Sequence, residues 1–388
     1  MNSAKSILLK IFTEYYLSAS QAKKEGRPIV WASAFVPVEI LRAMDVVCLY
    51  PESYAVVCSA SGKAPSMIHA SETAAFAQDL CSYSLIAFGM EHTDRLPYGG
   101  LPQPDLLVAS NNQCGTIPLW FRLLSQKLNI PLFILDYPAA DDQPSIQNYI
   151  QSQQQSLIKF LSQYTGGRLD PDRLSELIKF SRRASSLWRQ IHELNHENPP
   201  RLEAARIVDA LFPMVVARGT QSACDYYQAL LAECRTSQPS GGSPSMRLLW
   251  HGYPLWFLSG RFPRCFDDQF RIILNDYTLW WNLDYPDQSD DWQALTSAYS
   301  NTGLNWTLEK KIKAMLDLLD QYSIDGVICH ANRSCRRSLA DIVPIRELLS
   351  EKKIPSLLIE SDMADPDAYS AEQIRLRIES FREMMEVR

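Results

Sequence analysis

Two cysteines follow predicted strands at matching places in the two ends of the sequence. Cys114 comes nine residues after Asp105, which opens an apolar run, and Cys335 comes ten residues after Asp325, which opens another. Each cysteine is therefore expected at the carboxyl end of a parallel strand, where open α/β sheets place their ligands. The start of the following helix would favour thiolate over thiol at that point.

A third cysteine, Cys81, lies on a long amphipathic helix predicted for residues 72–90. Three thiolates from distant segments could hold an iron–sulfur cluster that leaves one iron without a protein ligand. The alternative is that all three are ordinary core residues, since free cysteine is often buried. Core packing is the preferred interpretation for the other six, of which three lie in strand-like runs and three on helical segments: Cys48, Cys58 and Cys329, then Cys224, Cys234 and Cys265.

Polar side chains near the same predicted edge are weaker candidates. His251 and His330 each end a predicted strand, so they could contact a substrate or cluster, or could be ordinary polar residues at a strand end. Arg336 stands with two other arginines at a predicted helix start, where a cation opposes the helix dipole. Either solvent screens these arginines, or they face an anion such as the phosphates of an acyl carrier or a reduced cluster.

Composition excludes several classes of protein. The chain has 388 residues, 46% hydrophobic and 21% charged, which is typical of a globular protein and not of a disordered one. Its net charge is −6 with both signs interspersed, which argues against a nucleic-acid partner. No apolar run approaches the roughly 20 residues of a membrane span, and Lys10 and Glu14 interrupt the N-terminal apolar stretch. We therefore predict a cytoplasmic protein with no membrane contact.

The cysteine count and the absence of common motifs narrow the chemistry further. Nine cysteines, an odd number, without an export signal favour reduced thiols or metal ligation over disulfides. The sequence has no CxxC, GxxxxGK[ST], GxGxxG, GxSxG or HExxH motif. Zinc-ribbon sites, the usual nucleotide-binding glycine loops and the standard hydrolase sites are therefore not indicated.

Alternation of strand and helix patterns predicts an α/β fold at both ends of the chain. The expected strands are residues 28–32, 46–50, 106–109 and 132–135 in the first part, and 247–250, 271–274, 326–329 and 356–359 in the last. Helical stretches between them, such as 117–128, imply parallel pairing, and a final helix is expected at 371–385.

The middle of the chain differs from both ends. Residues 145–235 show helical periodicity without a convincing strand, and the Pro-Ser-Gly-Gly-Ser-Pro run at 239–244 is the clearest linker. The predicted organisation is thus a first α/β domain at 1–144, a helical segment with linker at 145–243, and a second α/β domain at 244–388. The two outer domains are expected to be Rossmann-like parallel sheets.

Several short motifs, taken in order, resemble the D-component subunits of the 2-hydroxyacyl-CoA dehydratase family, which includes the class I benzoyl-CoA reductase subunits. The similarity extends over most of the chain. It is carried by Pro37-Val38-Glu39-Ile40-Leu41-Arg42-Ala43, Leu80-Cys81-Ser82-Tyr83, Ser110-Asn111-Asn112-Gln113-Cys114, Arg247-Leu248-Leu249-Trp250-His251-Gly252-Tyr253-Pro254, Ser334-Cys335-Arg336 and Ile359-Glu360-Ser361-Asp362-Met363-Ala364-Asp365-Pro366.

The resemblance implies that Cys81, Cys114 and Cys335 bind a [4Fe–4S] cluster whose fourth iron has a non-protein ligand. It further implies a heterodimer with a related D-component subunit and transient docking of an ATP-hydrolysing iron–sulfur activator that supplies one electron. The implied reaction is elimination of water from a (R)-2-hydroxyacyl-CoA substrate through a ketyl radical anion, in an oxygen-sensitive enzyme.

Alternatives within and outside the family stay open at this point. Chain length favours the shorter, β-type subunit, which would relay electrons to its partner. The chain could instead belong to a benzoyl-CoA reductase, or to a homodimeric ATP-dependent reductase with a double-cubane [8Fe–9S] cluster. A non-catalytic scaffold is the remaining alternative, and the presence of all three cysteines argues against it.

Overall fold

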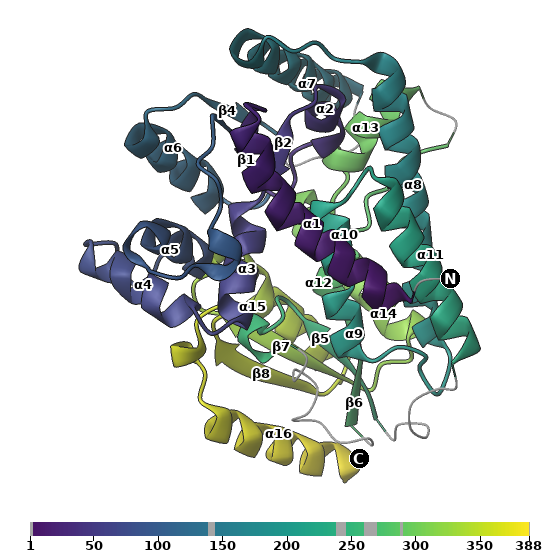
Figure 1. Ribbon diagram of the computed structural model, residues 1–388. Coiled ribbons are helices and arrows are strands. Elements are labelled where there is room, and N and C mark those ends of the chain that lie inside the picture. The colour runs from purple at the N-terminus through teal and green to yellow at the C-terminus, as the bar shows by residue number, and fades with distance from the viewer. Residues whose placement is uncertain (1–2, 139–143, 238–245, 260–269, 288–289, 388) are drawn as a thin grey trace.

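Two parallel four-stranded sheets organise the computed structural model, which describes residues 3–138, 144–237, 246–259, 270–287 and 290–387. In Figure 1 the first sheet lies in the upper half, the second in the lower half, and long helices run down one side. This arrangement confirms the predicted α/β class with two Rossmann-like sheets. Among the described residues, no helix is both long and apolar enough to cross a membrane.

The first sheet has the strand order β2-β1-β3-β4. Its strands are β1 (Ile29–Ala32), β2 (Val47–Leu49), β3 (Leu106–Ser110) and β4 (Leu132–Leu135), each within a few residues of the predicted range. Every residue of β1 and β3 is buried, because helices cover both faces of a parallel sheet and its central strands have no solvent side.

The helices of this first part are α1 (Ala4–Lys24), α2 (Val38–Ala43), α3 (Pro51–Ala60), α4 (Ala64–Thr73), α5 (Ser82–Gly89) and α6 (Thr116–Leu128). Cys58 lies on α3, so its assignment to a strand-like run was wrong. Pro51 at the first turn of α3 explains the difference, since proline there starts a helix without losing a hydrogen bond.

The long helix predicted for residues 72–90 was also wrong. Helix α4 ends at Thr73, a turn with Ala75 in a left-handed conformation follows, and α5 begins only at Ser82. The two short helices then pack so closely that a Cβ on Gly89 would lie 2.0 Å from the Met67 carbonyl oxygen. The break moves Cys81 from the middle of a helix to its N-terminus.

The middle of the chain is helical, as predicted. It contains α7 (Pro144–Thr165), α8 (Pro171–Glu193), α9 (Ala204–Asp209), α10 (Leu211–Val216) and α11 (Gln221–Thr236). The predicted linker at 239–244 and Cys265 lie outside the described residues.

The second sheet has the order β6-β5-β7-β8, which repeats the pattern of the first. Its strands are β5 (Met246–His251), β6 (Phe270–Asn275), β7 (Gly326–Asn332) and β8 (Ser356–Ser361). The helices around it are α12 (Asp276–Leu279), α13 (Asp291–Ser300), α14 (Leu308–Gln321), α15 (Arg336–Glu351) and α16 (Ala371–Glu386). Strand β7 continues past its apolar run because Ala331 and Asn332 pair with β8, so His330 lies within the strand and not at its end.

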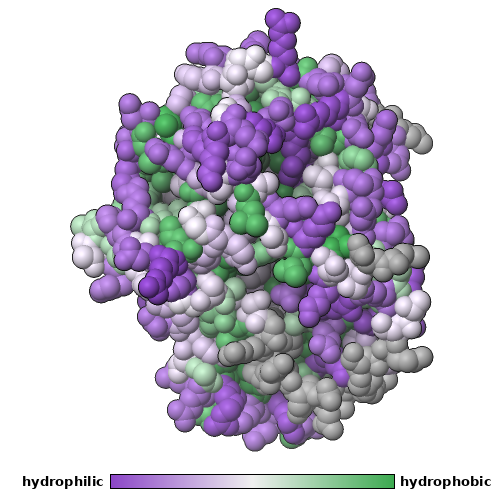
Figure 2. Space-filling model, in the orientation of Figure 1, coloured by the Kyte–Doolittle hydropathy of each residue, from purple (hydrophilic) through white to green (hydrophobic). Residues whose placement is uncertain are grey.

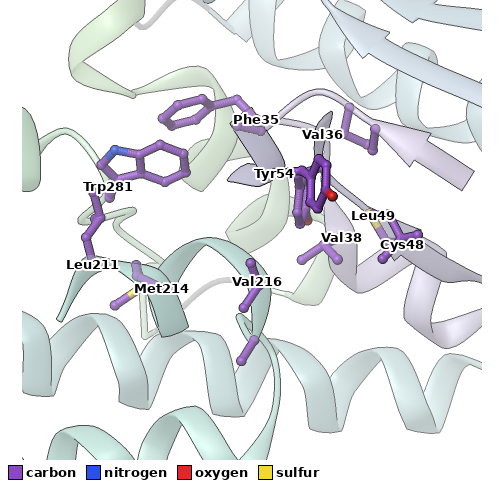
Figure 3. Close-up of a cluster of buried hydrophobic side chains, with 14 of the residues drawn as sticks. Phe35, Val36, Val38, Cys48, Leu49, Tyr54, Leu211, Met214, Val216 and Trp281 are labelled. Carbon is purple, nitrogen blue, oxygen red and sulfur yellow. The ribbon is translucent and has the colours of Figure 1, made fainter. Parts of the chain in front are cut away.

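The hydrophobic core joins these parts. Figure 3 shows Leu211 and Met214 of α10 close to Trp281, whose ring lies near that of Phe35 from the loop after β1. The Phe35 and Trp281 ring centroids are 4.7 Å apart. One buried cluster therefore contains residues of the first sheet, the helical segment and the start of the last part, whereas the second sheet has a separate cluster on each face.

Candidate functional site: a cysteine-lined cavity

The three predicted cysteines line one cavity of about 460 Å³. Cys81 is the N-cap residue of α5, Cys335 is the N-cap residue of α15, and Cys114 immediately precedes Gly115, the N-cap residue of α6. Strands β3 and β7 deliver Cys114 and Cys335 at their carboxyl ends, as the matched spacing predicted. The structure therefore brings together side chains that are more than 250 residues apart in sequence.

The thiols are close enough to influence one another electrostatically. Burial raises the pKa of Cys81 well above its usual value, and the nearby thiols of Cys335 and Cys114 raise it further. Burial likewise raises the pKa of Cys335 to about 11 and raises that of Cys114. Backbone N–H groups in the first turn of each following helix act in the opposite direction, because they stabilise a negative sulfur.

A buried carboxylic acid, Glu52, also lines the cavity and was missed by the sequence analysis. Its Oε1 accepts a hydrogen bond of 2.7 Å from the side-chain amide of Gln113, the residue before Cys114. Its Oε2 has no hydrogen-bond partner among the described residues. Burial raises the pKa of Glu52 to about 7, although the Gln113 amide and the backbone N–H of Ala34 lower it. The signal in the sequence is its place at the start of α3, directly after β2.

Aromatic side chains form the walls around the cysteines. Five of the aromatic residues that line the cavity are Tyr83, Tyr253, Trp256, Tyr277 and Trp281. The indole N–H of Trp256 donates to the hydroxyl of Tyr83, and the rings of Tyr253 and Tyr277 have centroids 4.5 Å apart. The Tyr253 hydroxyl interacts with the Cys335 sulfur and lowers the pKa of that thiol.

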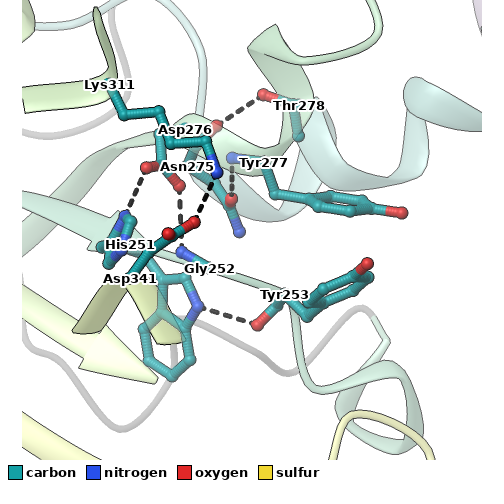
Figure 4. A network of polar contacts seen from close by, with 10 residues as sticks. His251, Gly252, Tyr253, Asn275, Asp276, Tyr277, Thr278, Lys311 and Asp341 are labelled. Atoms are coloured by element: carbon teal, nitrogen blue, oxygen red, sulfur yellow. Dashed lines mark hydrogen bonds and ion pairs between the residues drawn. The ribbon is translucent and has the colours of Figure 1, made fainter. Parts of the chain in front are cut away.

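His251 lies behind this wall and does not line the cavity. Its Nδ1 is 2.5 Å from the Asp276 carboxylate, whose other oxygen accepts a bond from the Gly252 N–H (Figure 4). Burial lowers the pKa of His251, but the charge and hydrogen bond of Asp276 outweigh burial and raise it. Gly252 has a φ of 101°, which glycine adopts without strain, and this turn directs Tyr253 toward the cavity.

His330 supports the same turn from the neighbouring strand. Its Nδ1 lies 2.7 Å from the carbonyl oxygen of Tyr253, and burial lowers its pKa to about 4. Trp250 also donates to that carbonyl, at 3.0 Å. The two histidines thus position an aromatic residue of the cavity and have no direct access to it.

Arg336 is exposed and pairs with Asp79 at 2.7 Å. The pair joins the start of α15 to the loop before Cys81, so it bridges two of the cysteine-bearing segments. Because both side chains are mostly exposed, the ion pair adds little to stability.

The outer part of the cavity is apolar and reaches the surface that α1 crosses. Helix α1 contributes Leu8 and Phe12, α3 contributes Val56, and α10 contributes Phe212 and Val215. Figure 2 shows hydrophobic residues scattered among hydrophilic ones on this face of the molecule. The cavity therefore combines a polar, thiol-rich inner end with an apolar passage.

Comparison with known proteins agrees with the motifs. A family model described as 2-hydroxyglutaryl-CoA dehydratase, D-component, matches residues 33–385. The chain is 27% identical to the (R)-2-hydroxyisocaproyl-CoA dehydratase alpha subunit of Clostridioides difficile, over 99% of this chain and 97% of that protein. It is 26% identical to the (R)-phenyllactyl-CoA dehydratase alpha subunit of Clostridium sporogenes, over 98% and 95%.

A third relative is a benzoyl-CoA reductase subunit of Thauera aromatica, 26% identical over 94% of this chain and 90% of that protein. The two dehydratase relatives are named alpha subunits, so the β-type assignment favoured by chain length receives no support from them. The names describe these three relatives as subunits of larger enzymes. The match over nearly the whole chain, together with the cysteine-lined cavity, shows that this protein belongs to the 2-hydroxyglutaryl-CoA dehydratase D-component family.

Proposed function

We propose that this chain is the substrate-holding subunit of a 2-hydroxyacyl-CoA dehydratase. In this proposal Cys81, Cys114 and Cys335 hold a [4Fe–4S] cluster with one iron open to the cavity. The observation that carries the proposal is the meeting of three helix-start cysteines in one cavity that reaches the surface. Such a cavity has room for a substrate beside the thiols, which a purely structural metal site would not need.

The donor set suits a cluster better than a single ion. Among the described residues, no group of three or more His, Cys, Asp or Glu side chains could hold one metal ion. Thiolates around a single ion lie within about 4 Å of one another, whereas a cluster of several irons spreads its thiolates further apart.

The protein's own groups would handle the proton and exclude water. When bound, the cluster would supply a single electron and a Lewis-acidic iron for the leaving hydroxyl. The substrate must also lose a proton from the carbon next to the one that bears the hydroxyl. Glu52 is the candidate to accept it, because this residue lines the cavity and burial raises the pKa of its carboxyl group to about 7. The aromatic walls keep bulk water away from the reacting atoms.

The proposal includes partners for the electron. The chain would pair with a related D-component subunit and receive its electron from a transient ATP-hydrolysing iron–sulfur activator. The related subunit is supported by the names of the relatives, which describe them as subunits. The separate ATP-hydrolysing activator agrees with the absence of a nucleotide-binding glycine loop in this sequence. A second candidate, a CoA-thioester reductase, is favoured by the similarity to the benzoyl-CoA reductase of Thauera aromatica.

Anaerobic purification with the co-purifying partner tests this function. Iron and sulfide counts should indicate four of each per set of three cavity cysteines, whereas a double-cubane cluster shared by two copies of the chain would give eight irons and nine sulfides per dimer. Single Cys→Ala changes at Cys81, Cys114 and Cys335 should remove iron and visible absorbance. Cys224→Ala is the matched control, since Cys224 is a buried thiol on α11 that does not line the cavity.

Two results would contradict the proposal. Retention of full iron content in any of the three cavity variants would show that the cluster is held elsewhere. Turnover of a 2-hydroxyacyl-CoA without any activator would contradict the single-electron chemistry. Conversion of an aromatic acyl-CoA to a reduced ring, without release of water from a hydroxyacyl-CoA, would select the reductase alternative.

A further inference from the structure

The apolar passage has few charged groups. Its walls come from three helices, with Leu8 and Phe12 on α1, Val56 on α3, and Phe212 and Val215 on α10. Among the described residues that line the cavity, no lysine or arginine occurs, and the charged members are Glu52 and Asp209, both acidic. A negatively charged group that entered this passage would meet carboxylates and apolar surface.

Aromatic rings make the passage suitable for a bulky apolar group. The Phe12 ring centroid lies 4.7 Å from that of Phe212 and 5.1 Å from that of Tyr98, and the three rings belong to separate segments. Tyr98 and Phe12 both line the cavity. Rings at these separations present both faces and edges, which favours contact with aliphatic or aromatic groups.

From these walls we infer that the acyl group bound here is uncharged, with an aliphatic or aromatic side chain, and that dicarboxylic acyl groups are excluded. The inference rests on the proposed function and specifies its substrate class. The physical reason is that a carboxylate moved from water to an apolar wall loses its hydration and gains no hydrogen bond or counter-charge in return, which disfavours binding. The acidic residues Glu52 and Asp209, which line the same cavity, increase the free-energy cost of placing a carboxylate there.

Binding of three unreactive thioesters tests the inference. The probes are 4-methylpentanoyl-CoA, 3-phenylpropanoyl-CoA and glutaryl-CoA, which lack the 2-hydroxyl group and so are not dehydrated. Because the CoA part is common to all three, its phosphates contribute equally and cancel in the comparison. Dissociation constants are measured by calorimetry on the full chain with its partner, loaded with cluster. We expect glutaryl-CoA to bind at least about 100-fold more weakly than the two apolar probes.

A variant that introduces a positive charge into the passage tests whether the apolar walls cause the weak binding of glutaryl-CoA. Val215→Arg places a cation in the passage and should narrow the difference between glutaryl-CoA and 4-methylpentanoyl-CoA to about tenfold or less. Leu119→Arg on α6 is the matched control, since Leu119 is exposed and does not line the cavity, and it should leave the ratio unchanged. If Val215→Arg does not fold, Leu8→Arg on α1 replaces it, and the three dissociation constants of the unaltered protein still test the inference.

The outcomes separate this inference from the proposed function. Equal binding of all three probes overturns the apolar selectivity and leaves acyl-CoA binding intact. Preferred binding of glutaryl-CoA also overturns the inference. No binding of any probe by the iron-loaded complex would overturn the placement of substrate in this chain, and with it both proposals.

Discussion

At the scale of single residues, three thiols and one carboxylic acid line the cavity, and they differ in the chemistry that they can perform. The cysteines each start a helix, where backbone N–H groups oppose the effect of burial on the thiol pKa. Glu52 has one oxygen held by Gln113 and one without a partner among the described residues. A carboxyl group in this state can take up and release a proton, which gives it the chemical capacity that the cysteines lack once they bind iron.

The first prediction concerns this acid. Glu52→Gln should lower kcat by about 100-fold or more, because general acid–base groups contribute on the order of 10² to 10⁴. The amide has nearly the same size, so iron content and acyl-CoA binding should change little. Steady-state kinetics with iron analysis measures both. Glu351→Gln, on the exposed end of α15, serves as the control, and an unaltered kcat in Glu52→Gln would remove this residue from the mechanism.

A buried histidine that does not line the cavity makes stability depend on pH. His192 on α8 has Nδ1 3.0 Å from the Trp188 carbonyl oxygen and Nε2 2.9 Å from the Thr278 hydroxyl. Burial lowers its pKa to about 4. The folded protein therefore keeps this ring neutral at pH values where the unfolded chain, with a pKa near 6.5, already binds a proton.

We therefore predict that stability falls as pH decreases from about 6.5 to 4, by about 3 kcal/mol in total from this residue. Above pH 6.5 the ring is neutral in both states and contributes no pH dependence. Urea unfolding at a series of pH values measures the effect. His192→Gln should reduce the slope in this interval, where the buried His330 contributes a second decrease of the same sign, while His69→Gln, on α4, should leave the slope unchanged. A curve of unchanged slope in His192→Gln would show that another group is responsible.

At the scale of elements, two short helices place Cys81. If α4 and α5 were one continuous helix, Cys81 would lie in its interior. The backbone N–H groups of the residues that follow Cys81 would then be used in helical hydrogen bonds. The turn after Thr73 lets α5 begin at Ser82 and fold back on α4. The hydroxyl of Ser71 donates to the Leu85 carbonyl at 2.6 Å, which links the two helices.

The close packing of these helices leads to a prediction at Gly89. Gly89→Ala should destabilise the protein by about 2 kcal/mol or more, because the new Cβ would lie 2.0 Å from the Met67 carbonyl oxygen and the backbones must separate. Thermal unfolding followed by circular dichroism gives the change. Gly115→Ala is the matched control, since a Cβ there meets nothing within 4 Å, and its effect should be small. Equal Tm values for the two variants would contradict the packing argument.

At the scale of the whole molecule, the parts are joined by a shared core and by buried polar contacts. The Glu39 carboxylate on α2 accepts hydrogen bonds from Ser181 of α8 at 2.5 Å, from Tyr285 at 2.7 Å and from Tyr299 of α13 at 2.8 Å. These donors come from the middle and last parts of the chain. The cavity lies among these parts and shares side chains such as Leu211 and Trp281 with the largest core cluster, whereas the two clusters of the second sheet contain none of its lining residues.

Most residues of the three core clusters do not line the cavity, so the fold is expected to survive loss of the iron–sulfur cluster in air. A cluster with one iron unprotected by thiolate should be lost in air, and the freed thiolates can then oxidise. We expect activity and visible absorbance to decay together while the far-ultraviolet circular dichroism changes little. The measurement is a parallel time course after aeration, with an anaerobic sample as the control. Loss of secondary structure in step with absorbance would show that the cluster stabilises the fold.

Much of the fold followed from local patterns in the sequence. Apolar runs of four or five residues between helical stretches located all eight strands to within a few residues, because a strand buried on both faces needs continuous apolar side chains. The equivalent positions of Cys114 and Cys335 also followed from sequence, since each lies at a fixed distance beyond the start of its strand.

Tertiary structure decided what local patterns could not. The break between α4 and α5 depends on contact of Gly89 with Met67, the inward position of Glu52 depends on Gln113, and the burial of His330 depends on β8. The apolar passage is assembled from α1, α3 and α10, which are distant in sequence. Periodicity reports which residues are buried within one element, whereas a cavity is defined by several elements that meet only after the chain has folded.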